Sequence, residues 1–176
     1  MKKVVETVRS EKPKQMSIFT LTTRWSIPEP IDAVWDCLVA TENWSSWWPY
    51  VAMVEQMATG DLSGIGNVRR YRWRTCLPYD LTIKMRVTEI RRYQSVVVEV
   101  AGDLIGGGSC MIIAHGSESE TELVFNWNVK LVKPWMKLLA GVARPLFVWN
   151  HQRVMKSGEQ GLIRHLSGDR TTGCAR

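Results

Sequence analysis

The feature that most constrains the fold of this chain is an alternation of apolar and polar side chains that recurs along its middle. The clearest example is residues 81–88, where Leu81, Ile83, Met85 and Val87 alternate with polar residues. A period of two is typical of a β-strand with one buried face. Alternation or β-branched composition predicts strands over residues 16–27, 51–59, 67–75, 81–88, 95–101, 109–115 and 123–130. The glycine-rich segments GDLSGIG and GDLIGGG between them predict hairpin turns.

Helical spacing of apolar residues occurs in three segments. Residues 31–40 follow the prolines that end the first strand, and residues 41–50 form a second short element rich in tryptophan. The helical spacing of apolar residues over 134–166 predicts a long helix, which Gly141 and Pro145 are expected to break or kink. Because a sheet with one apolar face needs a cover, these elements predict an α+β domain in which an antiparallel sheet packs on the long helix.

The ends of the chain lack a sustained period. Residues 1–15 have mixed charge and one proline, and they predict a flexible N-terminal arm. Residues 16–166 hold all the predicted strands and helices and are expected to form one domain. Residues 167–176 are polar and predict a flexible C-terminal tail.

A positive net charge combined with many tryptophans suggests one of three properties: binding to nucleic acid, binding to a membrane surface, or an internal cavity lined by tryptophan. The chain has nine tryptophans and a net charge of +6. Residues 16–129 carry nine basic and thirteen acidic residues, a net charge of −4, whereas residues 130–166 carry seven basic residues and one acidic residue, a net charge of +6. This distribution argues against a nucleic-acid groove across the domain. It is compatible with a basic helix that closes on an acidic body or makes a peripheral contact with an anionic membrane.

Targeting signals and metal motifs are not found in the sequence. With no run of about 18 apolar residues and no apolar signal segment at the N-terminus, we expect no transmembrane segment and a cytoplasmic location. The four widely spaced cysteines are expected to be reduced thiols, with Cys37 and Cys110 as small core residues. His115, His151 and His165 form no close pair, so neither a metal site nor a cofactor is predicted.

The order of the elements and three stretches of sequence resemble the START-like superfamily, also called SRPBCC or the polyketide cyclase/dehydrase and lipid transport family. The stretches are WSIPEPIDAVWDCLVATENWSSWWPYV, GDLSGIGNVRRYRW and KPWMKLLAGVARPLFVWNHQRVMKSGEQGL, the last of which resembles a bacterial subgroup of uncharacterised members. The resemblance covers residues 16–166. It implies a helix-grip fold, in which a curved antiparallel sheet wraps around the C-terminal helix, two short helices follow the first strand, and a cavity lies between sheet and helix.

Nine residues are candidates for the lining of such a cavity. Strand parity directs the first six toward the long helix, and the other three belong to that helix. They are Tyr71, Trp73, Ile83, Met85, Phe125, Trp127, Trp135, His151 and Met155. Each of them is also explained as an ordinary core residue. Together they are large enough to line a pocket of roughly 300–1,000 Å³.

His151 and Tyr71 are the candidate catalytic residues. His151 shares a helical stripe with Met155, so it is either a core histidine bonded to the backbone or a cavity residue that binds a ligand carbonyl or moves a proton. Asn150 is expected at the surface or at a kink in the helix. Gly158 is expected to let the helix approach the sheet.

Two further groups have a structural and a functional interpretation. Arg70, Arg72 and Arg74 form a row on one strand face, which is either a solvated outer face or a contact for an anion. The tryptophans of the second short element either anchor it to the core or form a portal at a membrane interface. They are Trp44, Trp47 and Trp48.

Three functions follow from these patterns. The first is binding, with or without transport, of a small hydrophobic ligand such as a lipid or polyketide in a cavity between sheet and helix. An interior filled solid by tryptophan would contradict it. The second is a polyketide cyclase/dehydrase-type enzyme that acts on a ligand in the same cavity. The third is an interaction module that uses the basic helix. Fold alone does not choose among them, because one fold hosts many functions.

Overall fold

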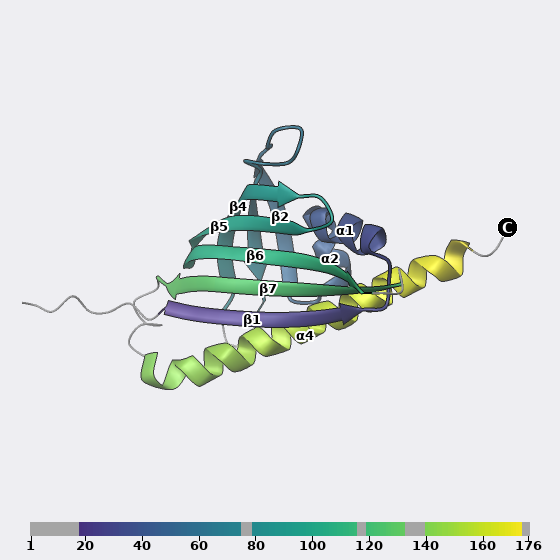
Figure 1. Cartoon of the computed structure of the whole chain (residues 1–176). Helices are drawn as coiled ribbons and strands as arrows, with labels where there is room; N and C mark the ends of the chain where they lie inside the picture. Colours follow the sequence, from purple (N-terminus) through teal and green to yellow (C-terminus); the bar gives the residue numbers. More distant parts are fainter. Residues whose placement is uncertain (1–17, 75–78, 116–118, 133–139, 174–176) are drawn as a thin grey trace, which may run out of the picture.

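Seven antiparallel strands form a single curved sheet in the order β1-β7-β6-β5-β4-β3-β2 (Figure 1). The structure is a computed structural model that describes residues 18–74, 79–115, 119–132 and 140–173, apart from the side chains of residues 140–144 and 169–173. The strands are β1 (Ile18–Ile27), β2 (Val51–Ala58), β3 (Val68–Trp73), β4 (Leu81–Arg91), β5 (Ser95–Gly102), β6 (Leu104–His115) and β7 (Glu120–Leu131).

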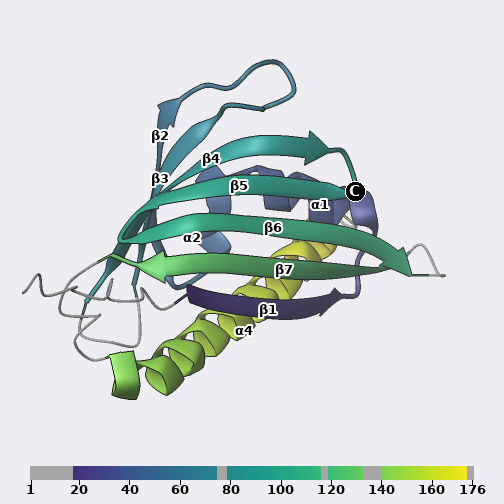
Figure 2. The same ribbon diagram turned by 60° about the vertical axis from the view of Figure 1, so that its left-hand side comes forward.

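The helices lie on one side of this sheet. They are α1 (Ile31–Val39), the single turn η1 (Thr41–Asn43), α2 (Trp44–Trp47) and α4 (Ala140–Gly173). Figure 2 shows α4 crossing behind β7 and β1, with α1 and α2 behind the middle strands. The α4 helix contacts β1 and α2, whereas α1 contacts β6 and β7. The predicted arrangement, a curved antiparallel sheet with a long C-terminal helix and two short helices after the first strand, is confirmed.

Strand parity sets which side chains reach the interior. On β4, Leu81, Ile83 and Met85 are buried, whereas Thr82 and Lys84 are exposed. Each outward residue keeps its polar group in water while each inward residue loses apolar surface to the core, which stabilises by about 25 cal/mol per Å². The alternation read from the sequence therefore oriented this strand correctly.

The segment GDLIGGG is a turn only at its beginning, so the expected break at residues 102–108 is wrong. Gly102 turns the chain with a φ of 116°, and a Cβ there would lie 2.7 Å from the Thr82 carbonyl oxygen. Strand β6 already begins at Leu104 and pairs with β7 along its whole length. At Gly106 a Cβ would collide with the Asn128 carbonyl oxygen. This glycine permits close approach of the two strands and does not end one.

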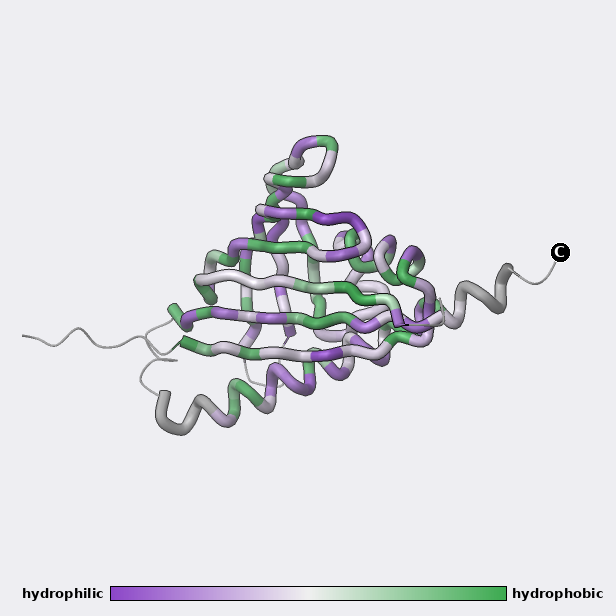
Figure 3. Tube along the Cα trace, viewed as in Figure 1, coloured by the Kyte–Doolittle hydropathy of each residue, from purple (hydrophilic) through white to green (hydrophobic). Residues whose placement is uncertain are grey.

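The α4 helix departs from the prediction in two ways. It is not broken at Pro145, which lies inside a helix that runs from Ala140 to Gly173, so of the expected break or kink only a kink stays a prediction. It also continues to Gly173, past the expected end at residue 166. Residues 167–173 are polar and carry no apolar period, so a pattern of burial could not reveal that they are helical. Along the rest of α4, hydrophobic and hydrophilic residues alternate (Figure 3).

The tryptophans of the second short element are buried, which supports their interpretation as anchors. Trp44, Trp47 and Trp48 are 8%, 6% and 2% exposed, and the Trp48 indole N–H donates to the Val154 carbonyl oxygen of α4 at 2.9 Å. A membrane-interface portal built from these three residues is wrong, because their rings point into the protein. Gly158 lies against the same cluster, as expected of a residue that lets the helix approach.

Candidate ligand-binding cavity

A cavity of about 660 Å³ lies between the concave face of the sheet and the short helices. Its volume falls within the roughly 300–1,000 Å³ typical of small-molecule sites. Most of its walls are apolar side chains from α1 and from strands β4 to β7. They include Leu38, Met85, Val87, Ile90, Val98 and Phe125. The interior is therefore hollow and is not filled solid by tryptophan. No described residue of α4 lines this space, so the expected position of the cavity, between the sheet and the C-terminal helix, is wrong for it. We call this space the main cavity.

The loop between β2 and β3 forms one rim of the main cavity. Leu62 at its tip is fully exposed. The Asp61 carboxylate accepts hydrogen bonds from the backbone N–H groups of Ser63 and Ile65, at 2.8 and 3.0 Å, and from the Ser63 hydroxyl. These bonds, led by the one from the Ser63 hydroxyl, lower the pKa of Asp61. The carboxylate therefore stays ionised and fixes the shape of the rim.

A polar cluster stands on the otherwise apolar wall of the main cavity. The Tyr71 hydroxyl donates to Thr41 Oγ1 at 2.9 Å, and the Arg69 guanidinium donates to the same oxygen and to the Val39 carbonyl. The Arg69 guanidinium also pairs with Glu42 at 3.0 Å. Arg69 Nε is buried and has no acceptor among the described residues. Burial raises the pKa of Tyr71, so its phenol stays protonated and is a hydrogen-bond donor.

Arg69 and Thr41 are functional candidates that the sequence interpretation missed. A signal for Arg69 was present, because it has the same parity as Tyr71 and Trp73 on β3 and therefore faces inward. The three neighbouring arginines of opposite parity drew attention to the outer face instead. That outer row is solvated as expected, with Arg70 paired to Glu55 at 3.0 Å.

A second space of about 100 Å³ lies between the sheet and α4, and we call it the small compartment. His151 faces into it from α4, with its Nε2 3.1 Å from the Thr23 hydroxyl. Burial lowers the pKa of His151 to about 4, so the imidazole is neutral near pH 7. Asn150 also lines this compartment and is only 4% exposed, so its expected surface position is wrong. Helical spacing placed His151 correctly but put its neighbour on the wrong side.

The predicted lining residues divide between the two spaces. Tyr71 and Met85 line the main cavity, Trp73, Ile83, His151 and Met155 line the small compartment, and Phe125 and Trp127 line both. Trp135 lies outside the described residues. Of the two catalytic candidates, Tyr71 borders the main cavity and His151 borders only the small compartment.

Cysteine and metal chemistry is limited in the described part of the chain. Cys110 lines the main cavity, and burial raises the pKa of its thiol, so the thiol stays protonated. Cys37 is half-buried. Cys76 and Cys174 lie outside the described residues. Within the described ranges, no group of three histidine, cysteine or acidic side chains is placed to hold a metal ion. No described helix is long and apolar enough to cross a membrane.

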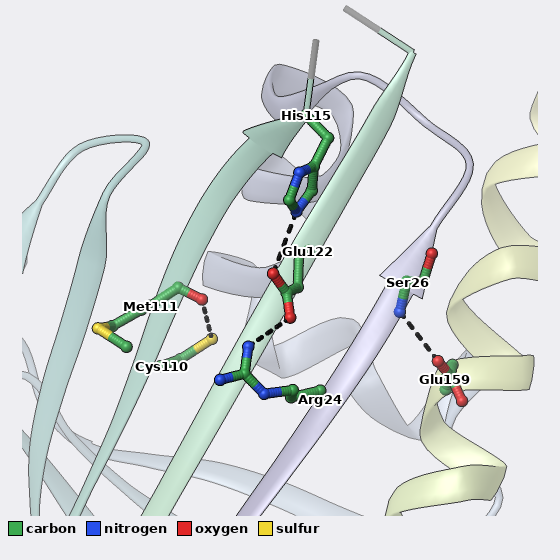
Figure 4. Close-up of polar contacts among 7 residues, drawn as sticks. All are labelled: Arg24, Ser26, Cys110, Met111, His115, Glu122 and Glu159. Atoms are coloured by element: carbon green, nitrogen blue, oxygen red, sulfur yellow. Dashed lines mark hydrogen bonds and ion pairs between the residues drawn. The ribbon is translucent and has the colours of Figure 1, made fainter. Parts of the chain in front are cut away.

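Polar contacts away from the two spaces join β7 to β1 and β6, and join β1 to α4. Glu122 accepts from Arg24 at 2.6 Å and lies 3.1 Å from His115 Nε2 (Figure 4). The hydrogen bond from Arg24 is the main reason that the pKa of Glu122 is lowered. The backbone N–H of Ser26 donates to Glu159 of α4 at 3.0 Å. None of these residues lines either space.

The outward face of α4 carries part of the positive charge seen in the sequence. Arg153, Lys156 and Arg164 are exposed, and the Arg153 guanidinium lies 5.4 Å from the ring centre of Trp149, which is itself 43% exposed. The charge therefore points to solvent and away from the sheet. Association of this face with an anionic surface stays a prediction.

Comparison with solved structures identifies the fold. The chain is similar to the Zhui aromatase/cyclase from Streptomyces sp. R1128, with a TM-score of 0.69 and 16% identity over 86% of this chain and 94% of that one. It is similar to a START superfamily protein from Mycobacterium smegmatis, with a TM-score of 0.69 and 10% identity over 85% and 97%. It is also similar to the protein TTHA0849 from Thermus thermophilus, with a TM-score of 0.67 and 17% identity over 83% and 98%.

Sequence comparison adds no relative to these. No protein-family model matches the chain, and no curated protein matches it in sequence. At 10–17% identity, the solved structures share a fold with this chain and do not establish its activity. The strand order, the helices on one side of the sheet and these structural neighbours agree: the chain has a helix-grip fold, the fold it shares with these START and aromatase/cyclase structures.

Proposed function

We propose that the protein binds a small hydrophobic ligand, such as a lipid or a polyketide, in the main cavity and carries it in the cell. The observation that supports this most is the volume of about 660 Å³ behind mostly apolar walls. A ligand that replaces water against these walls gains about 25 cal/mol for each Å² of apolar surface buried.

The polar cluster defines which end of the ligand is recognised. The Tyr71 hydroxyl and the Arg69 terminal N–H groups already donate within the cluster, but Arg69 Nε has no acceptor among the described residues. The Thr41 hydroxyl accepts both bonds and keeps its own hydrogen to donate, so a ligand oxygen has a preferred position beside it. The Arg69 charge is already balanced by Glu42. A neutral carbonyl or hydroxyl oxygen therefore suits the cluster better than a free anion.

Filling the main cavity is expected to abolish ligand binding with little change in stability. Val98 on β5 lines the main cavity, whereas Val97 has the opposite parity on the same strand. The Val98→Trp variant should lose any apolar small molecule that co-purifies with the wild type from its own host, as measured by native mass spectrometry. Thermal unfolding of the purified variant checks that the fold is intact.

The matched variant Val97→Trp is the control for this experiment. It adds the same indole to the same strand on the other face, so it should retain the co-purified molecule in the wild-type amount. A wild-type protein that carries no small molecule from its host, and binds none from a host lipid extract, would refute the proposed function.

A second candidate function is cyclase-type chemistry on a ligand in the main cavity. It is favoured by the positive charge of Arg69 and the Thr41 hydroxyl that Arg69 and Tyr71 hold in place, which together can polarise a ligand carbonyl, and by the structural likeness to an aromatase/cyclase. Tyr71, which borders the main cavity, remains the proposed acid/base residue for this activity, whereas His151 borders only the small compartment and would act only on a ligand that reaches into it. A donor that stabilises developing negative charge on oxygen contributes about 10²–10³ to a rate.

The Arg69→Met variant separates this second function from simple binding. If the protein is an enzyme, turnover of a short poly-β-ketone thioester should fall by about a hundredfold or more, while the affinity for the same compound falls much less. Liquid chromatography with mass detection measures the cyclised product, and calorimetry measures the affinity. Absence of product with the wild type would leave binding as the function and contradict the enzyme.

A further inference from the structure

We propose that the small compartment is a second subsite that holds the alkyl end of the ligand. We further propose that the Trp127 indole separates this compartment from the main cavity and moves aside when the ligand binds. The inference rests on the proposed function, because it assigns a position to one part of the same ligand. It predicts a ligand with an oxygen-bearing head and a short apolar tail.

The two spaces share a wall of three aromatic side chains. Trp44, Phe125 and Trp127 line both the main cavity and the small compartment. Displacement of one of these rings would therefore join the two spaces into one. Figure 2 shows the corresponding arrangement, in which α2 lies beside the middle strands and α4 crosses near β7 and β1.

Two of the three rings are held in place. The Trp44 indole donates its N–H to the Leu38 carbonyl oxygen at 3.2 Å and packs against Trp48 and Tyr71, with ring centres at 5.3 and 5.8 Å. The Phe125 ring packs against Trp25, with ring centres 4.6 Å apart. Moving either ring would break several contacts in the centre of the core.

Trp127 is held less firmly than its two neighbours. It is only half-buried, and within the described part of the chain its indole makes no hydrogen bond and no aromatic ring contact. Its ring lies over Gly108 of the adjacent strand, where a Cβ would sit 3.0 Å from two of the ring atoms. The missing side chain at Gly108 leaves the indole a flat surface on which to lie. These features make Trp127 the ring that can move.

The small compartment is suited to hydrocarbon. Most of its lining is aliphatic and aromatic, from Leu81, Ile83 and Leu104 on the sheet to Val154 and Met155 on α4. An apolar space of this kind stays dry when it is empty, so an apolar group that enters displaces little ordered water. Its volume of about 100 Å³ exceeds the roughly 10–15 Å³ that holds one water molecule, so it takes several methylene groups.

The polar side chains at the border of the compartment do not oppose this assignment. His151 is the titratable group there, and it is neutral near pH 7. Asn150 is the other polar residue of the lining, and Trp73, which also lines it, has a buried indole N–H with no acceptor among the described residues. The groups that recognise an oxygen, Arg69 Nε and the Thr41 hydroxyl, border the main cavity instead. The ligand is therefore oriented with its head toward β3 and its tail toward α4.

Two 4-n-alkylphenols test the subsite, because their heads are identical and their tails differ. Calorimetry would measure the affinity of the full chain for 4-ethylphenol and 4-octylphenol. Each buried methylene multiplies affinity about fourfold. In Val154→Phe, which fills the compartment from α4, the affinity for 4-octylphenol should fall at least tenfold while that for 4-ethylphenol changes less than twofold. In the control Leu146→Phe, on the exposed side of the same helix, both should keep wild-type affinity.

A measurement on the wild type covers the case in which Val154→Phe does not fold. A 4-octylphenol with a diazirine at the tail end is bound and irradiated, and peptide mass spectrometry locates the label. Labelling of Ile83, Val154 or Met155 supports the subsite. Labelling confined to Val87 or Val98 in the main cavity would overturn it, as would an equal loss of both phenols in Val154→Phe. Failure of the wild type to bind either phenol would refute the proposed function itself.

Discussion

Replacing Gly158 by alanine is expected to destabilise the protein by about 2–3 kcal/mol, although alanine favours a helix over glycine by about 1 kcal/mol. The added Cβ would lie 2.6 Å from Cζ2 of Trp48 and 2.7 Å from Cη2 of Trp25. Both rings are buried and packed on other aromatic rings, so neither can give way cheaply. The midpoint of thermal unfolding should fall by about 5–10 °C, which calorimetry or circular dichroism would measure.

Gly168→Ala is the matched control on the same helix. A Cβ at Gly168 would meet nothing within 4 Å, so only the helix preference of alanine remains. This variant should be more stable than the wild type by about 0.5–1 kcal/mol. Equal effects of the two substitutions would mean that α4 does not pack closely on the tryptophans of α2 and β1.

Acidification from pH 7 to pH 4 is expected to cost the folded state about 2–3 kcal/mol through His151 alone. Its folded pKa of about 4 lies below the ordinary value of 6.5, because burial disfavours the charged form. The unfolded state therefore takes up a proton as the pH falls through 6.5, whereas the folded state does not until about pH 4. Stability is unaffected above pH 6.5 and is lost progressively between these two values.

The His151→Gln variant isolates this contribution. Glutamine can still form a hydrogen bond with the Thr23 hydroxyl but does not titrate. Urea unfolding at pH 7, 6, 5 and 4 should show a smaller loss of stability in this variant than in the wild type. Identical pH profiles for both proteins would contradict the buried, neutral state of His151.

The two largest effects depend on the same packing of α4 against the sheet. Gly158 brings the helix within contact of the tryptophans, and His151, two turns earlier, is buried as a result. The helix thus closes the small compartment on one side, while the short helices cover the main cavity. A loss of close packing at Gly158 should therefore also raise the pKa of His151 toward its ordinary value.

Much of the cavity wall could be read from strand parity. Tyr71, Met85, Phe125 and Trp127 were assigned to the interior because a period of two leaves only two faces. Arg69 has the same parity on its strand as Tyr71, so it also faces inward. It was not predicted to line the cavity, because it is charged and stands next to the outward-facing Arg70. The partner that stabilises an inward arginine, Glu42 of η1, is 27 positions away in the sequence and is brought close only by folding.

Glycines were the least reliable signal. The GDLIGGG segment looked like a turn because glycines are found both in turns and where two strands pair closely, and the sequence does not distinguish these two cases. Only the positions of Asn128 and Trp127 on the neighbouring strand show why Gly106 and Gly108 carry no side chain. The position of Asn150 was misjudged for a related reason, since one step of 100° along a helix separates the buried side from the exposed side.

The sequence by itself determined the class of fold, the order of its elements and the inward face of most strands, because hydrophobic periodicity is a local property of neighbouring residues. Only the tertiary structure decided that the interior is hollow, that Trp44, Phe125 and Trp127 lie between its two spaces, and that Arg69, Tyr71 and Thr41 form one cluster. A cavity is the volume left between side chains from distant segments, and no local pattern specifies whether such side chains meet or leave a space.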